Sequence, residues 1–169
     1  MSEFAILKIT QGELTNRHEL QPALFRQVIE TLLKMLARGV KPVVVIQAEP
    51  GAAIYCMGGA PAALIEQTRL IAQWVAVFSE SNILSAQLVV ERCRDGTDRQ
   101  LLHALSTIRT LADLGVIPVL IHNQLTWLTG RAEEVQWDIA ECLADRLRAT
   151  IEAPKREQEQ VMERDHVIA

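Results

Sequence analysis

The chain has 169 residues, of which 49% are hydrophobic and 22% charged, and its formal net charge is -4. This length fits one domain with a sizeable buried core and is short for two. The 17 basic residues are scattered along the sequence, so no basic face predicts nucleic-acid binding. Aromatic residues make up only 4%, and the abundance of aliphatic residues favours helices packed on a sheet over a β-sandwich.

The cysteines and the first ten residues indicate a reduced, cytoplasmic protein. Cys56, Cys93 and Cys142 are odd in number and contain no CxxC pair, which argues against a disulfide framework and a zinc site. The opening MSEFAILKIT has Glu3 before its apolar run and Lys8 within it, so it is neither a signal peptide nor a membrane span. We therefore expect a cytoplasmic location and no membrane partner.

Apolar patterns in the first part of the chain predict a strand, a helix and a second strand. The run at 4–9, broken only by Lys8, is typical of a buried strand. Apolar residues recur at three- and four-residue spacing from Leu20, which predicts a helix that Gly39 ends. The continuous β-branched run at 42–46 predicts a strand covered on both faces, near the centre of a sheet.

The rest of the chain continues the same alternation. It predicts a helix from 61, a strand at 86–90, a helix at 101–114, a strand at 116–121 and a helix at 137–147. The order βαβαβαβα predicts an α/β fold with a mostly parallel sheet flanked by helices on both faces. We expect one domain over residues 1–151 and a charged tail over 152–169, either frayed or a partner-binding helix.

Lys8 is the first candidate for a functional residue. A cation near the end of a buried strand is costly unless it reaches solvent or an anion. It therefore either binds a phosphate or carboxylate ligand, or lies on an edge strand with its ammonium in solvent. Ligands of open α/β sheets bind beyond the carboxyl ends of the strands, so the loops after Ile9, Ile46, Val90 and Ile121 should share one rim.

Two other groups of residues are weaker candidates for a site. His103, His122 and Cys93 are possible metal ligands, but their spacing matches no zinc pattern, and we expect no metal. The Met-Gly-Gly-Ala turn at 57–60 precedes a predicted helix. It either binds an anion through backbone amides or serves only as a turn.

The segments AILKITQGELT and PVVVIQAEPGAA resemble the first two strands of the amino-acid kinase family, and most closely its glutamate 5-kinase branch. In that family a catalytic lysine precedes a glycine and a serine. Lys8 matches the lysine, whereas Thr10 and Gln11 replace the small turn residues. Gly51 and Ala52 match a second turn, whose two serines have no counterpart. The resemblance implies a catalytic role for Lys8 and a ligand-binding role for Gly51 and Ala52.

The stretch 63–123 resembles the family's region from a Gly-Gln helix to its substrate-binding loop. There the family has an Asn-Glu-Asn-Asp motif, and this chain has Ile-His-Asn-Gln at 121–124, so only Asn123 matches. A later Phe-Gly-Asp-Asn-Asp motif falls at 135–138, where Asp138 remains. The resemblance implies a ligand-binding role for Asn123 and Asp138. Asp138 also stands at a predicted helix start, where a carboxylate is a good cap.

In the family, the carboxylates of these two motifs would bind a substrate ammonium and orient groups around a transferring phosphoryl group. Most of these carboxylates are absent from this chain. The family's domain also continues with a second half that supplies the nucleotide site, so the resemblance implies a truncated, N-terminal half. We expect a catalytically inactive module, without a cofactor, that acts through homo-oligomerisation or protein binding. Two alternatives remain: a binder or sensor of an acidic amino acid or phosphate, and a kinase that makes an acyl phosphate from ATP and magnesium with a nucleotide site from another chain.

Overall fold

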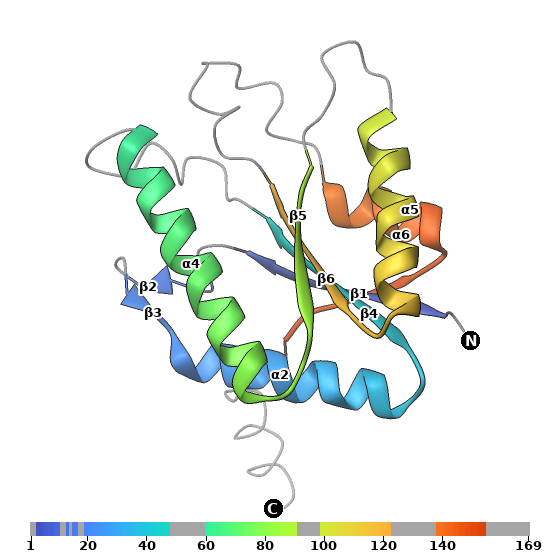
Figure 1. The fold of residues 1–169 in the computed structure, drawn as a ribbon, viewed down its shortest axis with the longest axis horizontal. Coiled ribbons are helices and arrows are strands. Elements are labelled where there is room, and N and C mark those ends of the chain that lie inside the picture. The colour runs from blue at the N-terminus through green and yellow to red at the C-terminus, as the bar shows by residue number, and fades with distance from the viewer. Residues whose placement is uncertain are drawn as a thin grey trace, which may run out of the picture.

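The computed structural model describes residues 3–10, 13, 15–16, 19–47, 60–90, 99–122 and 138–154. Within them, five strands form one parallel sheet in the order β5-β6-β4-β1-β7 (Figure 1). The strands are β1 (Phe4–Thr10), β4 (Lys41–Gln47), β5 (Ser85–Val90), β6 (Ile117–His122) and β7 (Thr150–Glu152). The helices are α2 (Pro22–Ala37), α4 (Ala60–Glu80), α5 (Arg99–Asp113) and α6 (Ile139–Leu147). A short antiparallel pair, β2 (Thr15–Asn16) and β3 (Glu19–Leu20), follows β1.

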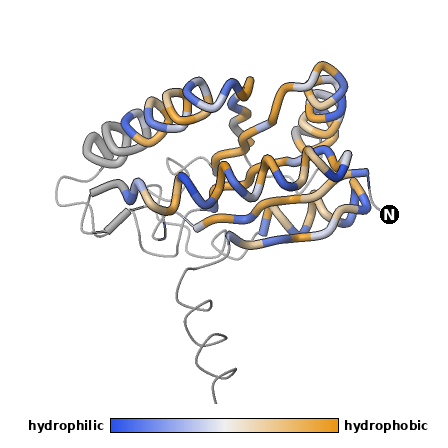
Figure 2. The backbone as a smooth tube through the Cα atoms, turned by 90° about the horizontal axis from the view of Figure 1, so that it is seen from below, coloured by the Kyte–Doolittle hydropathy of each residue, from blue (hydrophilic) through white to orange (hydrophobic). Residues whose placement is uncertain are grey.

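Both faces of the sheet are covered, as the apolar run of β4 predicts. Successive residues of β4 fall alternately into two hydrophobic clusters. Val44 and Ile46 pack in the cluster that contains α2 and α4, and Val43 and Val45 in the cluster that contains α5 and α6. In Figure 2 the strands are largely hydrophobic, whereas the helices carry both hydrophilic and hydrophobic residues. The predicted α/β fold, with helices on both faces of a parallel sheet, is confirmed.

The side on which each helix lies follows the direction of its connection. The connections through α2 and α4 advance across the sheet toward β5, and these two helices share one face. The connections through α5 and α6 advance toward β7, and these helices share the other face. A single handedness of crossover requires this division. As a result, β4 is central, and the carboxyl ends of all five strands point to one edge.

Strand β7 is a feature that the sequence patterns did not predict. It pairs with β1 over three residues, with Ile6 opposite Ile151. It includes Glu152, the first residue of the segment expected to form the tail, and Pro154 just beyond it is buried. Because β1 lies between β4 and β7, it is not the edge strand that one interpretation of Lys8 expected, although its pairing with β7 ends at Leu7, one residue before Lys8.

The predicted helix stops at Gly39 and Gly115 are confirmed. Both glycines have a φ of +72°, and each follows the last turn of its helix. After α2, the Val40 amide donates to the Met35 carbonyl at 3.1 Å, and the Gly39 amide donates to Leu36 at 2.9 Å. This six-to-one and five-to-two pattern provides donors for carbonyls that have no hydrogen-bond partner within the helix. Glycine adopts the left-handed conformation that the pattern requires without steric cost.

The amino end of the sheet carries its own charged cluster. Lys41 donates to the Asp113 carboxylate at 2.9 Å and to the Glu3 carboxylate, and its ammonium lies 5.6 Å from the Phe4 ring centre. The hydrogen bond to Asp113, followed by that to Glu3, raises the pKa of Lys41 above its ordinary value. The cluster therefore stabilises the fold below the ordinary lysine pKa and loses that effect only as the pH rises through the raised one.

Two adjacent leucines of α2 test the assignment of its buried face. Leu32 is fully buried and Leu33 is 46% exposed. Leu32→Ala should lower the free energy of unfolding by about 2–5 kcal/mol, because it leaves a cavity in the core. Leu33→Ala, the matched control, should change it by about 0.5 kcal/mol. Urea unfolding of both variants measures the difference, and equal losses would contradict this packing of α2.

Candidate functional site

Lys8 forms an ion pair at the carboxyl end of β1. Phe4 and Ile6 precede it at two-residue intervals and belong to the cluster packed by α5 and α6, so the Lys8 side chain projects to that face. There its Nζ donates to Oδ2 of Asp138. The Lys8 and Asp138 side chains are 29% and 19% exposed. The pair is therefore shielded, yet open to a ligand from solvent.

Asp138 serves the helix as well as Lys8. It is the N-cap of α6, with extended backbone angles of -87° and 100°, and its side chain accepts a hydrogen bond from the Glu141 amide at 3.2 Å. A carboxylate at this position satisfies a free amide and suits the positive end of the helix dipole. The predicted cap is confirmed. One carboxylate thus joins the first strand to the last described helix.

The turn after β1 is closed by a carboxylate of its own. The Thr10 amide and hydroxyl donate to Glu13 Oε2 at 2.8 and 3.0 Å, and the Glu13 amide donates back to the Thr10 hydroxyl at 3.3 Å. The reciprocal arrangement has the T-x-x-E spacing of a capping box. Two donors at the end of β1 are therefore already bound to an anionic group of the chain itself.

Gln47 is a residue at this rim that the sequence analysis missed. It ends β4 beside Thr10 of β1, and its alternation with Val43 and Val45 places it on the same face as Lys8. Its Oε1 is buried and has no hydrogen-bond partner within the described part of the chain. A signal was available: Gln47 is the first polar residue after the apolar run at 42–46.

The other predicted site residues lie outside the described residues. These are Gly51, Ala52 and Asn123, together with Cys93. Among the residues that the structure describes, no three His, Cys, Asp or Glu side chains are grouped so that they could hold a metal ion. Within the same residues, no helix is long and apolar enough to cross a membrane.

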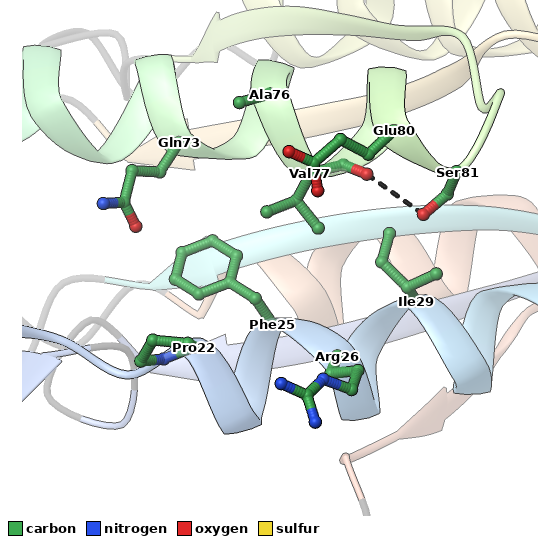
Figure 3. Close-up of a pocket in the computed structure, with 9 residues that line it drawn as sticks. All are labelled: Pro22, Phe25, Arg26, Ile29, Gln73, Ala76, Val77, Glu80 and Ser81. Atoms are coloured by element: carbon green, nitrogen blue, oxygen red, sulfur yellow. Dashed lines mark hydrogen bonds between the residues drawn. The ribbon is translucent and has the colours of Figure 1, made fainter.

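A hollow lies on the other face of the sheet. It is a groove of about 450 Å³ between α2 and α4 (Figure 3). Phe25 and Ile29 of α2 point toward α4, and Val77 faces them. Arg26 and Glu80 add one charge of each sign to the lining. Because Lys8 and Asp138 belong to the face of α5 and α6, this groove is separate from their rim.

Comparison with known proteins gives similarity to glutamate 5-kinases. The chain is 34% identical over 92 residues to those of Pseudomonas putida (strain W619) and Pseudomonas entomophila (strain L48), a match that covers 54% of this chain and 24% of each relative. It is 28% identical over 159 residues to that of Stutzerimonas stutzeri (strain A1501), covering 88% of this chain and 42% of the relative. The similarity supports an amino-acid-kinase-like relationship. The chain spans less than half the length of these relatives, and no protein-family profile matches it.

In this amino-acid-kinase-like chain, two residues that the family resemblance singles out are brought together. Lys8 and Asp138 are 130 positions apart in the sequence and contact each other at the rim. The contact requires β1 and α6 to meet on one face, which the β6-to-β7 connection provides. The pair is thus a product of the fold rather than of sequence proximity.

The two roles of Asp138 can be separated by substitution. Asp138→Asn keeps a capping oxygen but removes the charge, whereas Asp138→Ala removes both. The free energy of unfolding of Asp138→Ala should therefore be about 1 kcal/mol lower than that of Asp138→Asn. In a Lys8→Met background the asparagine substitution should cost less, with a coupling of about 0.5–1 kcal/mol. Urea unfolding of this double-mutant cycle measures both terms. Independent effects of Lys8 and Asp138 would contradict the ion pair.

Proposed function

We propose that this chain is a catalytically inactive amino-acid-kinase-like module that binds a small acidic ligand at the rim of Lys8 and Asp138. The observation that carries the proposal is that carboxylates of the chain accept from donors at this rim, while the Lys8 side chain stays 29% exposed. Asp138 accepts from Lys8, and Glu13 accepts from the amide and hydroxyl of Thr10. These donors stand at the end of the first strand, where the resemblance to kinases places the phosphate-handling lysine and turn.

Charge is the physical reason why this arrangement disfavours phosphoryl transfer. The transferring phosphoryl group carries charge on its equatorial oxygens, and catalysis depends on donors and cations directed at them. Here one ammonium, that of Lys8, faces the carboxylate of Asp138, and Glu13 adds a second carboxylate beyond Thr10. With Lys8 positive and these two carboxylates negative, the three charges sum to -1. A nucleotide phosphate would meet net repulsion from them.

A ligand with a smaller net negative charge, such as an acidic amino acid, meets less of this repulsion than a nucleotide phosphate. An ammonium has three donors, and one of those of Lys8 is directed at Asp138. The 29% exposure of the Lys8 side chain leaves access for a ligand. The relatives are named for glutamate, so L-glutamate is the first ligand to test. Gly51, Ala52 and Asn123 are proposed to contribute to the same pocket.

Binding and catalysis can be tested on one sample. L-glutamate at about a hundredfold excess over its dissociation constant should stabilise the protein by about 2.7 kcal/mol, seen as a raised melting temperature. Lys8→Met should lose this shift. With ATP, magnesium and glutamate together, hydroxylamine trapping should detect no acyl phosphate above the level of Lys8→Met. Trapped acyl phosphate that requires Lys8 would show instead that the chain is a working kinase.

A second candidate function, assembly with itself, is favoured by an exposed apolar pair at the opposite end of the sheet. Leu84 and Leu114 are 68% and 70% exposed. They precede the neighbouring strands β5 and β6, and the Ile117 amide donates to the Leu84 carbonyl at 2.8 Å. Exposed large apolar groups at the same end of a sheet favour association. Because this end is remote from Lys8, assembly there would leave the rim open.

The assembly proposal predicts the effect of charges at this end. Wild type should be a homo-oligomer at micromolar concentration by light scattering. The double substitution Leu84→Glu and Leu114→Glu should lower its mass, because a buried carboxylate in an interface is costly. Leu36→Glu, at a leucine that is 43% exposed on α2, is the matched control and should leave the mass unchanged. A monomeric wild type would exclude self-assembly.

A further inference from the structure

We infer that Gln47 is a ligand-binding residue whose side-chain oxygen accepts a hydrogen bond from an amino or hydroxyl group of the ligand. The inference rests on the proposed function and makes the ligand class narrower. It predicts that the ligand is a small carboxylic acid that carries a hydrogen-bond donor. It also predicts that the protein binds an acid of the same length more weakly when that acid lacks the donor.

Gln47 stands next to the proposed pocket. Lys8 pairs with Val45 across the sheet, and Thr10 pairs with Gln47. Gln47 is therefore one strand over from Lys8 and one step nearer the carboxyl edge. Both side chains project to the face of α5 and α6. One strand spacing and two residues along the strand separate such diagonal positions by roughly 8 Å, a span that a small amino acid can bridge.

The buried oxygen of Gln47 needs an explanation, because a lone acceptor removed from water destabilises the folded state. Gln47 Oε1 is buried and lacks a hydrogen-bond partner among the residues that the structure describes. Gln47 also follows five buried residues of β4, so an apolar side chain would suit its position. A donor brought by a ligand would satisfy the oxygen.

The neighbouring carboxylates already accept hydrogen bonds from the chain itself. Asp138 Oδ2 accepts from Lys8 and Oδ1 accepts from the Glu141 amide. Glu13 Oε2 accepts from both donors of Thr10. Lys8 supplies donors for a ligand carboxylate, and Gln47 supplies an acceptor for a ligand donor. Inorganic phosphate or a plain dicarboxylate would engage Lys8 and leave the Gln47 oxygen unsatisfied.

The experiment compares L-glutamate with glutarate, which has the same two carboxylates and no amino group. Dissociation constants are measured by calorimetry for wild type, Gln47→Met and the control Gln73→Met, at an exposed glutamine on α4. Wild type and Gln73→Met should prefer glutamate by about tenfold or more. Gln47→Met, which keeps the shape of the side chain, should reduce the preference by about fivefold or more. The difference in net charge between glutamate and glutarate acts alike on all three proteins, so the change in preference reports the hydrogen bond. The melting temperature of Gln47→Met without ligand should not fall, because the variant removes a buried acceptor that has no partner in the described part of the chain.

Each outcome separates the inference from the proposed function. If wild type binds neither compound, the proposed function fails and the inference fails with it. If wild type binds both equally, or if Gln47→Met retains the preference, the binding site stands and the role of Gln47 is wrong. Gln47→Leu is a second variant with the same expected loss of preference, so poor folding of one substitution does not leave the question open.

Discussion

Burial of β1 and β4 on both faces is the constraint on which the rest of the structure depends. The interiors of these strands are apolar and almost fully buried, so their polar side chains stand at the two ends. At the amino end, Lys41 pairs with carboxylates whose side chains are 64% and 67% exposed. At the carboxyl end, Lys8 pairs with a carboxylate that is 19% exposed. The second environment is drier, and electrostatic contacts with a ligand are stronger there.

The ion pair at the carboxyl end also closes the chain on itself. Asp138 caps the start of α6, and α6 leads to β7, which pairs with β1 up to Leu7, the residue before Lys8. The same stretch of chain thus supplies the partner of Lys8 and removes β1 from the edge. Substitutions at Asp138 therefore act on the helix end and on the rim together, and only variants that separate capping from charge can distinguish the two.

Periodicity predicted the sheet, its covering helices and the glycine stops, because each depends on local spacing and backbone geometry. It missed β7, whose three residues are too few to show a pattern and depend on pairing with β1. Lys8 and Asp138 were found through a family resemblance, but their contact depends on topology. Gln47 was missed because a polar residue after an apolar run also marks the start of a loop. Gly51, Ala52 and Asn123 remain predictions.

The ion pair and the unpaired oxygen differ in what they say about function. A lysine near a buried strand end requires a counter-charge in any stable fold, and a carboxylate at a helix start is favourable by itself. Stability alone can therefore account for Lys8 and Asp138. It does not account for Gln47, whose buried Oε1 has no hydrogen-bond partner among the described residues, because such an acceptor lowers stability. Of the residues at this rim, the one that weakens the free protein is the stronger indication of a ligand.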